Sequence, residues 1–339
     1  MIFRRKTSGA SAVAEREGRP PLEQLLEEID SLGRANRERP DGERERRIQR
    51  LRHLAGVQLV ERASSRPQQP GPDHDRLPER DSGLPEIAPG ELDAGLLRAG
   101  ILRDGCLLVR GLVDPDEAAR LVAEIDRAFA ARDAQVAGQP VDRAYYAELE
   151  PEPPFVINDR EWTGSVWVPD SPRVMFEVLD VFDRTGLRQV IADYLGERPA
   201  LSVNKCTLRR VSPDTGSAWH QDGAFLGDVR AMNVWLALSH CGDVAPGLDI
   251  IPRRFDHFVP TGTEGAWFDW SVAPDVAEEA AGGSEILRPI FEPGDVLLFD
   301  HMFLHATGVS PGMTSDRYAV ESWFFGPSAF PGDYVPIAY

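Results

Sequence analysis

Two histidines, an aspartate and an arginine in the C-terminal half of this chain have the types and spacing of a metal centre. His220 and Asp222 are two residues apart, so on a β-strand their side chains project from the same face. His305 offers a second imidazole further along the chain. Two histidines and one carboxylate form the facial set that holds non-haem Fe(II) and leaves positions open for a co-substrate and dioxygen. We therefore predict an iron site at His220, Asp222 and His305.

Arg317 follows His305 closely and is expected to lie near it. Residues 293–300 have the pattern of a turn followed by a buried strand, and residues 317–325 have the pattern of a second strand. The loop between them contains Gly308, Pro311 and Gly312, so we expect these two strands to pair. A guanidinium beside the metal would clamp a carboxylate through two parallel hydrogen bonds.

Four blocks of sequence, in this order, resemble the phytanoyl-CoA dioxygenase family of Fe(II)/2-oxoglutarate-dependent oxygenases. They are residues 219–222 (Trp-His-Gln-Asp), 233–238 (Asn-Val-Trp-Leu-Ala-Leu), 245–252 (Ala-Pro-Gly-Leu-Asp-Ile-Ile-Pro) and 293–299 (Pro-Gly-Asp-Val-Leu-Leu-Phe), the last continuing through His305 to Arg317. Residues 104–121 also look like the family's opening strand and first helix. The resemblance covers residues 85–325, which makes it far more specific than an isolated His-x-Asp motif.

The resemblance implies a fold, two cofactors and a reaction. The fold is α+β, a double-stranded β-helix (a jelly-roll or cupin-like barrel) with flanking helices. The cofactors are Fe(II) and 2-oxoglutarate, and the distal carboxylate of 2-oxoglutarate would bind Arg317. The reaction is hydroxylation of an aliphatic C–H bond of a small molecule, natural-product or lipid-like, with dioxygen as oxidant and release of succinate and carbon dioxide. Related halogenases have a small residue in place of Asp222, so its carboxylate favours hydroxylation.

Trp235 and Thr307 match positions that the family associates with the co-substrate. An indole beside the site would pack against 2-oxoglutarate, and the Thr307 hydroxyl would hydrogen-bond its distal carboxylate. An ordinary core position is an equally open interpretation of Trp235.

Lys205 is of interest because the chain has only two lysines among its 37 Lys and Arg residues. In the expected strand 201–209, Lys205 shares a face with Thr207 and Arg209. If that face points into the barrel, the ammonium would hold a carboxylate of the substrate or of 2-oxoglutarate, with Thr207 beside it. A lysine on the outer surface of the strand is the alternative.

Seven histidines compete for the metal site. His301 is the main rival of His305, because it lies four residues earlier and shares the same strand parity. The family-like spacing to Arg317 favours His305 and leaves His301 as a neighbour of the ligands. His53 and His74 are expected to be exposed, and His240 and His257 are expected in surface or structural positions.

The N-terminal part is expected to form a helical hairpin. Leucine and isoleucine recur at helical spacing over residues 22–32 and 48–59, with a turn at residues 39–42 (Arg-Pro-Asp-Gly) between them. Residues 64–84 are rich in proline and are expected to form a linker. We therefore divide the chain into a helical extension (1–63), a linker (64–84) and a dioxygenase domain (85–339). In this domain helical segments at 115–132 and 171–195 precede a strand-rich half.

Composition excludes some classes of partner. The chain of 339 residues has a formal net charge of −18, and most of the negative charge lies beyond residue 70. Such a catalytic part repels polyanions, so nucleic acid is not an expected substrate and a coenzyme A thioester is disfavoured. There is no apolar run long enough for a membrane span. The three cysteines have no paired metal spacing, which favours small buried residues in a reduced, cytoplasmic protein.

Two other classes of protein are compatible with these patterns. A cupin-like metal isomerase or an oxygenase that does not use 2-oxoglutarate would share the ligands but would not need Arg317. A non-catalytic scaffold would work through its N-terminal helices, which are also a candidate surface for a homo-oligomer or a protein partner. Residues 265–270 (Gly-Ala-Trp-Phe-Asp-Trp) form either a substrate lid or a cap on the barrel core.

Overall fold

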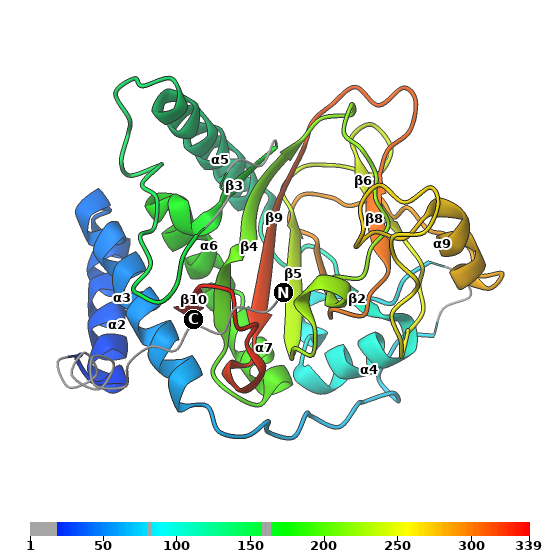
Figure 1. Cartoon of the computed structure of the whole chain (residues 1–339), viewed down its shortest axis with the longest axis horizontal. Helices are drawn as coiled ribbons and strands as arrows, with labels where there is room; N and C mark the ends of the chain where they lie inside the picture. Colours follow the sequence, from blue (N-terminus) through cyan, green and yellow to red (C-terminus); the bar gives the residue numbers. More distant parts are fainter. Residues whose placement is uncertain (1–18, 80–82, 158–159, 161–163) are drawn as a thin grey trace.

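An eight-stranded sheet forms the centre of the molecule (Figure 1). The computed structural model describes residues 19–79, 83–157, 160 and 164–339. The strands follow the order β1-β2-β7-β5-β9-β4-β10, with β3 paired to β4. β1 and β2 are parallel, and the other pairs are antiparallel. The strands are β1 (Glu86–Ile87), β2 (Cys106–Val109), β3 (Ser165–Trp167), β4 (Ala200–Val211), β5 (Ala231–Ala237), β7 (Val296–Phe299), β9 (Arg317–Phe325) and β10 (Pro336–Ala338).

Strand β5 shows how the sheet separates two hydrophobic cores. Met232, Val234 and Leu236 belong to the core under the helices. Trp235 and Ala237, which point to the opposite face, belong to a second core. Because both faces are covered, all seven residues of β5 are buried, which explains why this strand is almost continuously apolar in sequence.

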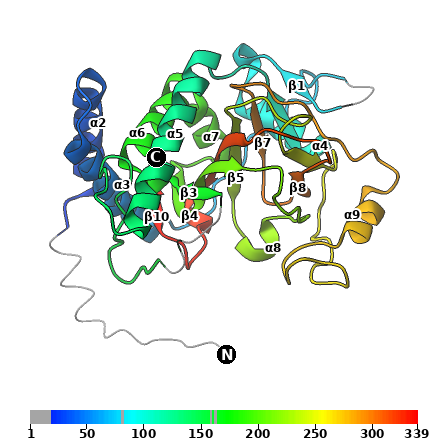
Figure 2. The same ribbon diagram turned by 90° about the horizontal axis from the view of Figure 1, so that it is seen from above.

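Helices cover one face of the large sheet. Figure 2 shows α5 (Pro115–Val136), α6 (Pro172–Arg184) and α7 (Leu187–Leu195) together on this side, and α4 (Ala94–Asp104) packs on β2. Residues 171–195 are helical as predicted but form two helices, because Gly186 adopts a φ of 79°, a left-handed conformation that interrupts the helix. Short 3-10 helices lie at η1 (Pro89–Glu91), η2 (Val168–Asp170) and η3 (Pro327–Ala329).

A small sheet lies on the other side of the large one. It pairs β6 (Gly247–Ile250) with β8 (His305–Gly308), and its residues Leu248 and Ile250 join the second core. The short helices α8 (Gly223–Leu226) and α9 (Pro274–Ala281) belong to this half of the molecule. Figures 1 and 2 place β8 and α9 away from α5 and α6. Two sheets thus face each other across one core, as in a jelly roll, whereas closure into a full barrel stays a prediction.

The expected pairing of residues 293–300 with residues 317–325 is wrong. Both segments form strands, β7 and β9, but β5 lies between them and pairs with each. The chain between β7 and β9 crosses to the small sheet, where it forms β8. The chain therefore re-enters the large sheet as β9, which β5 separates from β7, so β7 and β9 do not form a hairpin.

The N-terminal hairpin packs against the end of the large sheet. As predicted, α2 (Leu22–Glu38) and α3 (Gly42–Arg62) contact each other, and α3 lies across β10. A Cβ at Gly56 would lie 2.8 Å from the backbone nitrogen of Ala338, so only glycine allows this close approach. The Arg52 guanidinium donates to Ala338 O at 2.9 Å, and His53 Nδ1 lies 2.9 Å from Pro336 O. The prediction that His53 is exposed is wrong, because the packing of α3 on β10 buries its ring.

The proline-rich segment after α3 runs along the lower edge of the molecule in Figure 1. Arg66 forms an ion pair with Asp228 at 2.8 Å, and the Arg230 side chain donates to the carbonyl of Pro67. Residues 80–82 of the predicted linker lie outside the described residues. The division into 1–63, 64–84 and 85–339 stays a prediction.

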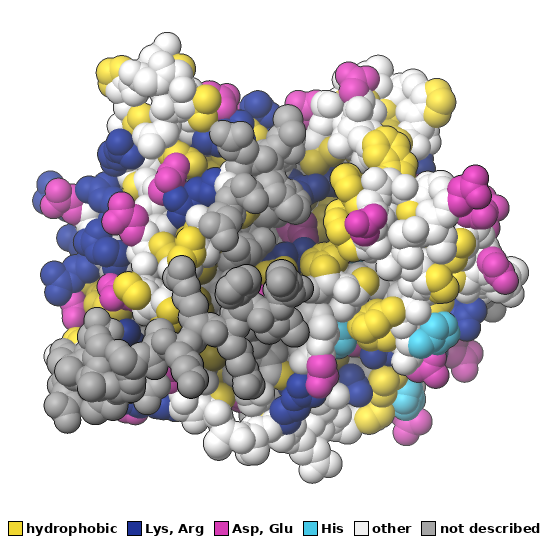
Figure 3. Space-filling model, viewed as in Figure 1, with side chains coloured by type: hydrophobic (Ala, Val, Ile, Leu, Met, Phe, Trp, Pro, Cys, Tyr) yellow, Lys and Arg dark blue, Asp and Glu magenta, His cyan; other side chains and the backbone are white. Residues whose placement is uncertain are grey.

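The two halves of the molecule differ in surface character. Figure 3 shows Lys/Arg and Asp/Glu side chains interspersed over the N-terminal helices, and hydrophobic side chains to the right of centre, over the half that bears the small sheet. Within the described ranges, no helix combines the length and the apolar character that a membrane crossing requires.

Candidate metal centre

The side chains of His220, Asp222 and His305 converge. His220 and His305 pair through reciprocal backbone hydrogen bonds of 2.9 and 3.1 Å, and Asp222 follows immediately before α8. Asp222 Oδ2 lies 3.9 Å from His220 Nε2 and 4.0 Å from His305 Nε2. One donor atom from each residue lies within 4.8 Å of the other two. The structure therefore brings together the three residues predicted as ligands.

Backbone carbonyls orient both imidazoles. His220 Nδ1 lies 2.9 Å from Ala218 O, and His305 Nδ1 lies 3.1 Å from Phe303 O. An imidazole that donates its Nδ1–H to a carbonyl keeps the Nε2 lone pair for a metal. Both Nε2 atoms face the carboxylate of Asp222, so the donor set has the nitrogen and oxygen chemistry of an Fe(II) site.

Lys205 lies beside Asp222 in the structure. Its Nζ is 2.7 Å from Asp222 Oδ1, and both side chains are largely buried. Burial alone would raise the pKa of Asp222, but Lys205 and the two imidazoles outweigh it and lower this pKa to about 2. Burial likewise lowers the pKa of Lys205, but the carboxylates of Asp222 and Glu321 more than offset it and raise that pKa. Asp222 is thus an anion with one oxygen held and the other facing the imidazoles.

The imidazole of His305 is neutral at neutral pH, the state in which it can bind a metal. Burial is the largest cause that lowers its pKa, the positive charge of His220 adds to it, and the resulting pKa is about 4. A metal binds the deprotonated Nε2 of an imidazole. At neutral pH His305 therefore needs no proton release before it can bind a metal.

His301 takes no part in the cluster. It lies in the turn before β8, not on the strand, so strand parity does not align it with His305. Its Nδ1 is buried without a hydrogen-bond partner among the described residues, and its carbonyl accepts from Gly223 N at 2.8 Å. A Cβ at Gly223 would lie 2.8 Å from the His301 ring. His301 therefore packs beneath α8 and supports the backbone that carries Asp222.

Arg317 is a buried cation with no ion-pair partner among the described residues. Its Nη1 donates to Gly247 O at 2.8 Å, while its Nε is buried without a partner. Its guanidinium lies over the Trp235 ring, 5.5 Å from the centroid. Burial lowers the pKa of Arg317 to about 10, so the group stays charged at neutral pH. A buried charge is costly without a counter-charge, and Arg317 therefore fits an anionic ligand such as a carboxylate.

Thr207 and Trp235 lie in one row of the large sheet, since both are in register with Glu321 of β9. Thr207 Oγ1 is buried without a hydrogen-bond partner. Thr307 lies two residues after His305 on β8 and is half-buried. The predicted cofactor residues thus lie on two facing sheets, and their roles stay predictions.

Sequence reasoning does not single out three further side chains of this interior: Asn233, Glu321 and Trp323. Asn233 and Trp323 are in register with each other, and neither Asn233 Oδ1 nor Trp323 Nε1, both buried, has a hydrogen-bond partner in the described part of the chain. The signal for them is strand parity, because Asn233 shares the face of Trp235, and Trp323 shares the face of Arg317. These orphaned polar atoms fit a pocket built for a polar ligand.

Exposed aromatic side chains stand next to the metal centre. Trp270 packs edge-on against His220 with ring centroids 5.6 Å apart, and Phe225 packs edge-on against Trp270 at 5.5 Å. Phe268 stacks on Trp270 at 4.9 Å. All three aromatic side chains are solvent-exposed, which favours the lid over the core cap for residues 265–270.

The sequence matches the phytanoyl-CoA dioxygenase family over residues 101–313, which is more than half of the chain. The chain belongs to this family. The matched region contains His220, Asp222 and His305 and ends before Arg317. Family membership and the His–Asp–His cluster together identify an enzyme that depends on iron and 2-oxoglutarate.

The chain is also similar to solved structures. AviO1 from Streptomyces viridochromogenes Tue57 is 21% identical, with 71% of this chain and 98% of that chain covered and a TM-score of 0.47. EctD from S. alaskensis, crystallised with 2-oxoglutarate and 5-hydroxyectoine, is 17% identical, with 78% and 84% covered and a TM-score of 0.46. The epimerase SnoN, in complex with Fe3+, alpha ketoglutarate and nogalamycin RO, is 17% identical, with 68% and 83% covered and a TM-score of 0.43. No curated protein matches the sequence.

Proposed function

We propose that the protein hydroxylates an aliphatic C–H bond of a small molecule, with 2-oxoglutarate and dioxygen as co-substrates and succinate and carbon dioxide as co-products. One observation carries the proposal. The His220–Asp222–His305 cluster occurs in the same chain as Arg317, a buried charge with no ion pair to any described residue. A cupin-like enzyme without 2-oxoglutarate has no use for that charge.

The cluster residues would hold the iron. His305 binds as a neutral imidazole and Asp222 as a carboxylate, as their lowered pKa values require. Lys205 holds the second oxygen of Asp222 and so orients the carboxylate. When bound, the iron supplies the activation of dioxygen, a reaction for which side chains alone are not suited.

Arg317 would bind the distal carboxylate of 2-oxoglutarate. Its guanidinium fork presents two parallel donors, which fixes the orientation of a carboxylate as well as its position. The Trp235 ring covers the guanidinium and keeps it away from water. The hydroxyls of Thr207 and Thr307 are the candidate additional donors, and Thr207 Oγ1 has no other partner among the described residues.

The aromatic side chains next to His220 indicate the kind of substrate. Three exposed aromatic side chains form a wall beside the metal centre: Phe225, Phe268 and Trp270. Trp270 is the innermost and packs against His220, a predicted metal-binding residue. A wall of rings binds apolar and ring-bearing molecules through surface burial and stacking. The strongly negative net charge of −18 disfavours a polyphosphorylated substrate. We therefore expect an apolar small molecule, natural-product or lipid-like.

Turnover of the iron-loaded enzyme tests the proposal. The protein is incubated with Fe(II), 2-oxoglutarate and a panel of apolar ring-bearing compounds, and succinate, oxygen uptake and product mass are measured. The proposal predicts succinate in step with a product that has gained one oxygen atom, and loss of both in Asp222→Ala. Trp270→Ala should raise the KM for the compound and leave the KM for 2-oxoglutarate unchanged. Product without succinate would instead support the cupin-like alternative, and no turnover or 2-oxoglutarate binding would support a scaffold.

A further inference from the structure

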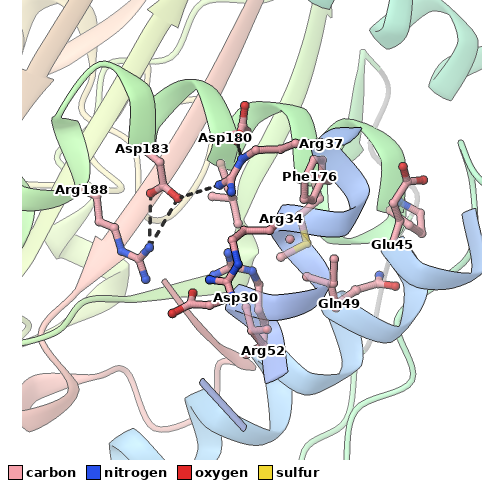
Figure 4. A pocket seen from close by; sticks show the side chains of 16 residues that line it. Asp30, Arg34, Arg37, Glu45, Gln49, Arg52, Phe176, Asp180, Asp183 and Arg188 are labelled. Carbon is pink, nitrogen blue, oxygen red and sulfur yellow. Dashed lines mark hydrogen bonds and ion pairs between the residues drawn. The ribbon is translucent and has the colours of Figure 1, made fainter. Parts of the chain in front are cut away.

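A second pocket lies far from the metal centre, between the N-terminal hairpin and the helices behind the large sheet. It has a volume of about 240 Å³ and is lined by α2, α3, α6 and Arg188 of α7 (Figure 4). Ile48, Met175 and Phe176 form part of its apolar wall. The hairpin and the small sheet lie on opposite sides of the molecule in Figures 1 and 2, so this pocket is separate from the site of the proposed reaction.

Four arginines and four carboxylates make up most of the polar lining of this pocket. The arginines are Arg34, Arg37, Arg52 and Arg188. Figure 4 shows the guanidinium groups of Arg34 and Arg52 close together, whereas Arg37 is turned toward Asp183, with Arg188 beside the same carboxylate. Because like charges repel, an anion between Arg34 and Arg52 would be stabilised.

Three of the four lining carboxylates already form ion pairs with arginines of the chain. Glu45 accepts from Asn36 at 3.0 Å and from Arg173 at 2.5 Å. Asp180 pairs with Arg37 and, at 2.9 Å, with Arg184. Asp183 pairs with Arg188 at 3.4 Å. The fourth carboxylate, Asp30, is exposed on α2, and among the described residues it has no hydrogen bond or ion pair.

Two guanidinium groups therefore face the pocket without a carboxylate. Arg34 has no hydrogen bond or ion pair to any described residue. Arg52 is only 9% exposed, and the hydrogen bond it makes to a described residue goes to the carbonyl of Ala338. Burial, and then the charge of Arg188, lower the pKa of Arg52 to about 10. The floor of the pocket thus holds a desolvated cation that forms no ion pair with any described residue.

We propose that this pocket binds a small phosphate monoester, with the phosphate on Arg34 and Arg52 and the organic part on Ile48, Met175 and Phe176. A tetrahedral phosphate accepts hydrogen bonds from several directions, which suits guanidinium groups from two different helices, whereas a carboxylate is satisfied by one planar fork. The volume exceeds what a phosphate alone fills and leaves room for a ring or short chain. The bound ester would connect α2 and α3 to α6 and so strengthen docking of the hairpin.

Calorimetric titration of the full chain with phenyl phosphate tests this proposal, with inorganic phosphate and benzoate as comparison ligands. Phenyl phosphate should bind tightest, because only it offers both the tetrahedral anion and the ring. Arg34→Gln and Arg52→Gln should each lower the affinity for phenyl phosphate about tenfold or more. Each variant loses a charge-assisted hydrogen bond, which contributes about 1.5–3 kcal/mol. Arg50→Gln is the matched control, since Arg50 is an exposed arginine of α3 outside this pocket.

His305→Ala separates this site from the metal centre and should leave phenyl phosphate binding unchanged. Equal binding in Arg34→Gln and wild type, or loss of binding in His305→Ala, would overturn the proposal. So would benzoate binding as tightly as phenyl phosphate. Arg34 is exposed and makes no hydrogen bond or ion pair to a described residue, so its variant gives a decisive result even if Arg52→Gln fails to fold.

Discussion

The two oxygens of Asp222 have different partners, and this division is the main feature of the metal centre at the scale of single residues. Oδ1 accepts from Lys205 at 2.7 Å, while Oδ2 faces the two imidazoles at 3.9 and 4.0 Å. Asp222 immediately precedes α8 but does not cap it with its side chain. Its carboxylate therefore remains available for a metal.

Replacement of Lys205 by methionine should destabilise the metal-free protein more than the metal-loaded protein. Without a metal, Lys205 is the closest counter-charge of the buried Asp222 carboxylate. Breaking such a buried pair costs about 3–5 kcal/mol, whereas a bound Fe(II) would replace the lost positive charge. Thermal unfolding with and without anaerobic Fe(II) measures the difference. If the metal-free Lys205→Met variant melts at the wild-type temperature, the pair has no such role.

Replacement of Arg317 by alanine should weaken 2-oxoglutarate binding and leave Fe(II) binding unchanged. Loss of a buried charge partner costs on the order of 2–5 kcal/mol, which corresponds to about 30-fold or more in affinity. Arg317→Lys should recover only part of it, because an ammonium lacks the planar fork. Anaerobic titration of the iron-loaded protein gives both constants. Wild-type affinity in Arg317→Ala would revive an enzyme that does not use 2-oxoglutarate.

At the scale of secondary structure, local patterns predict the elements better than their partners. The strand at 317–325 agrees with β9, and the helices at 22–32, 48–59 and 115–132 appear as parts of α2, α3 and α5. The pairing of β7 with β9 was wrong because strand order depends on where the chain crosses between sheets, which no local pattern records. The same limit applies to Lys205. Its strand face is predictable, but its partner Asp222 comes from a different segment.

The helix α3 should dock less firmly as the pH falls. His53 Nδ1 lies 2.9 Å from Pro336 O, and His53 Nε2 accepts from Glu152 N at 2.9 Å. A protonated ring cannot accept that hydrogen bond, and burial lowers the pKa of His53 in the folded protein. In the unfolded chain the pKa of histidine is about 6.5. The folded protein takes up this proton only at a lower pH, so the free energy of unfolding should decrease as the pH falls below that value.

The variant His53→Gln isolates this effect. Glutamine can donate to Pro336 O and accept from Glu152 N, but it does not titrate. Melting temperatures measured between about pH 7.5 and 5.5 should fall more steeply for wild type than for His53→Gln. Parallel curves would show that His53 does not couple α3 to pH.

At the scale of the whole molecule, we expect the hairpin and the sheet to unfold together, because α3 packs closely on β10. Gly56 lets α3 lie against β10, and a side chain there would lie 2.8 Å from backbone atoms of that strand. The substitution Gly56→Ala should therefore separate the helix from the strand and lower the melting temperature. Gly33→Ala in α2 is the matched control, because nothing lies within 4 Å of a Cβ at Gly33. A similar effect of both substitutions would mean that the hairpin folds independently.

Binding of Fe(II) by four proteins tests the central claim most directly. Wild type, Asp222→Ala, His305→Ala and His301→Ala are dialysed anaerobically against Fe(II), and bound metal is measured beside a circular dichroism spectrum. The structure predicts stoichiometric iron in wild type and in His301→Ala, because the His301 side chain lies outside the cluster. It predicts loss of iron in Asp222→Ala and His305→Ala, with the fold retained in both. Iron retained by a folded His305→Ala protein and lost from His301→Ala would contradict the assignment of the metal centre.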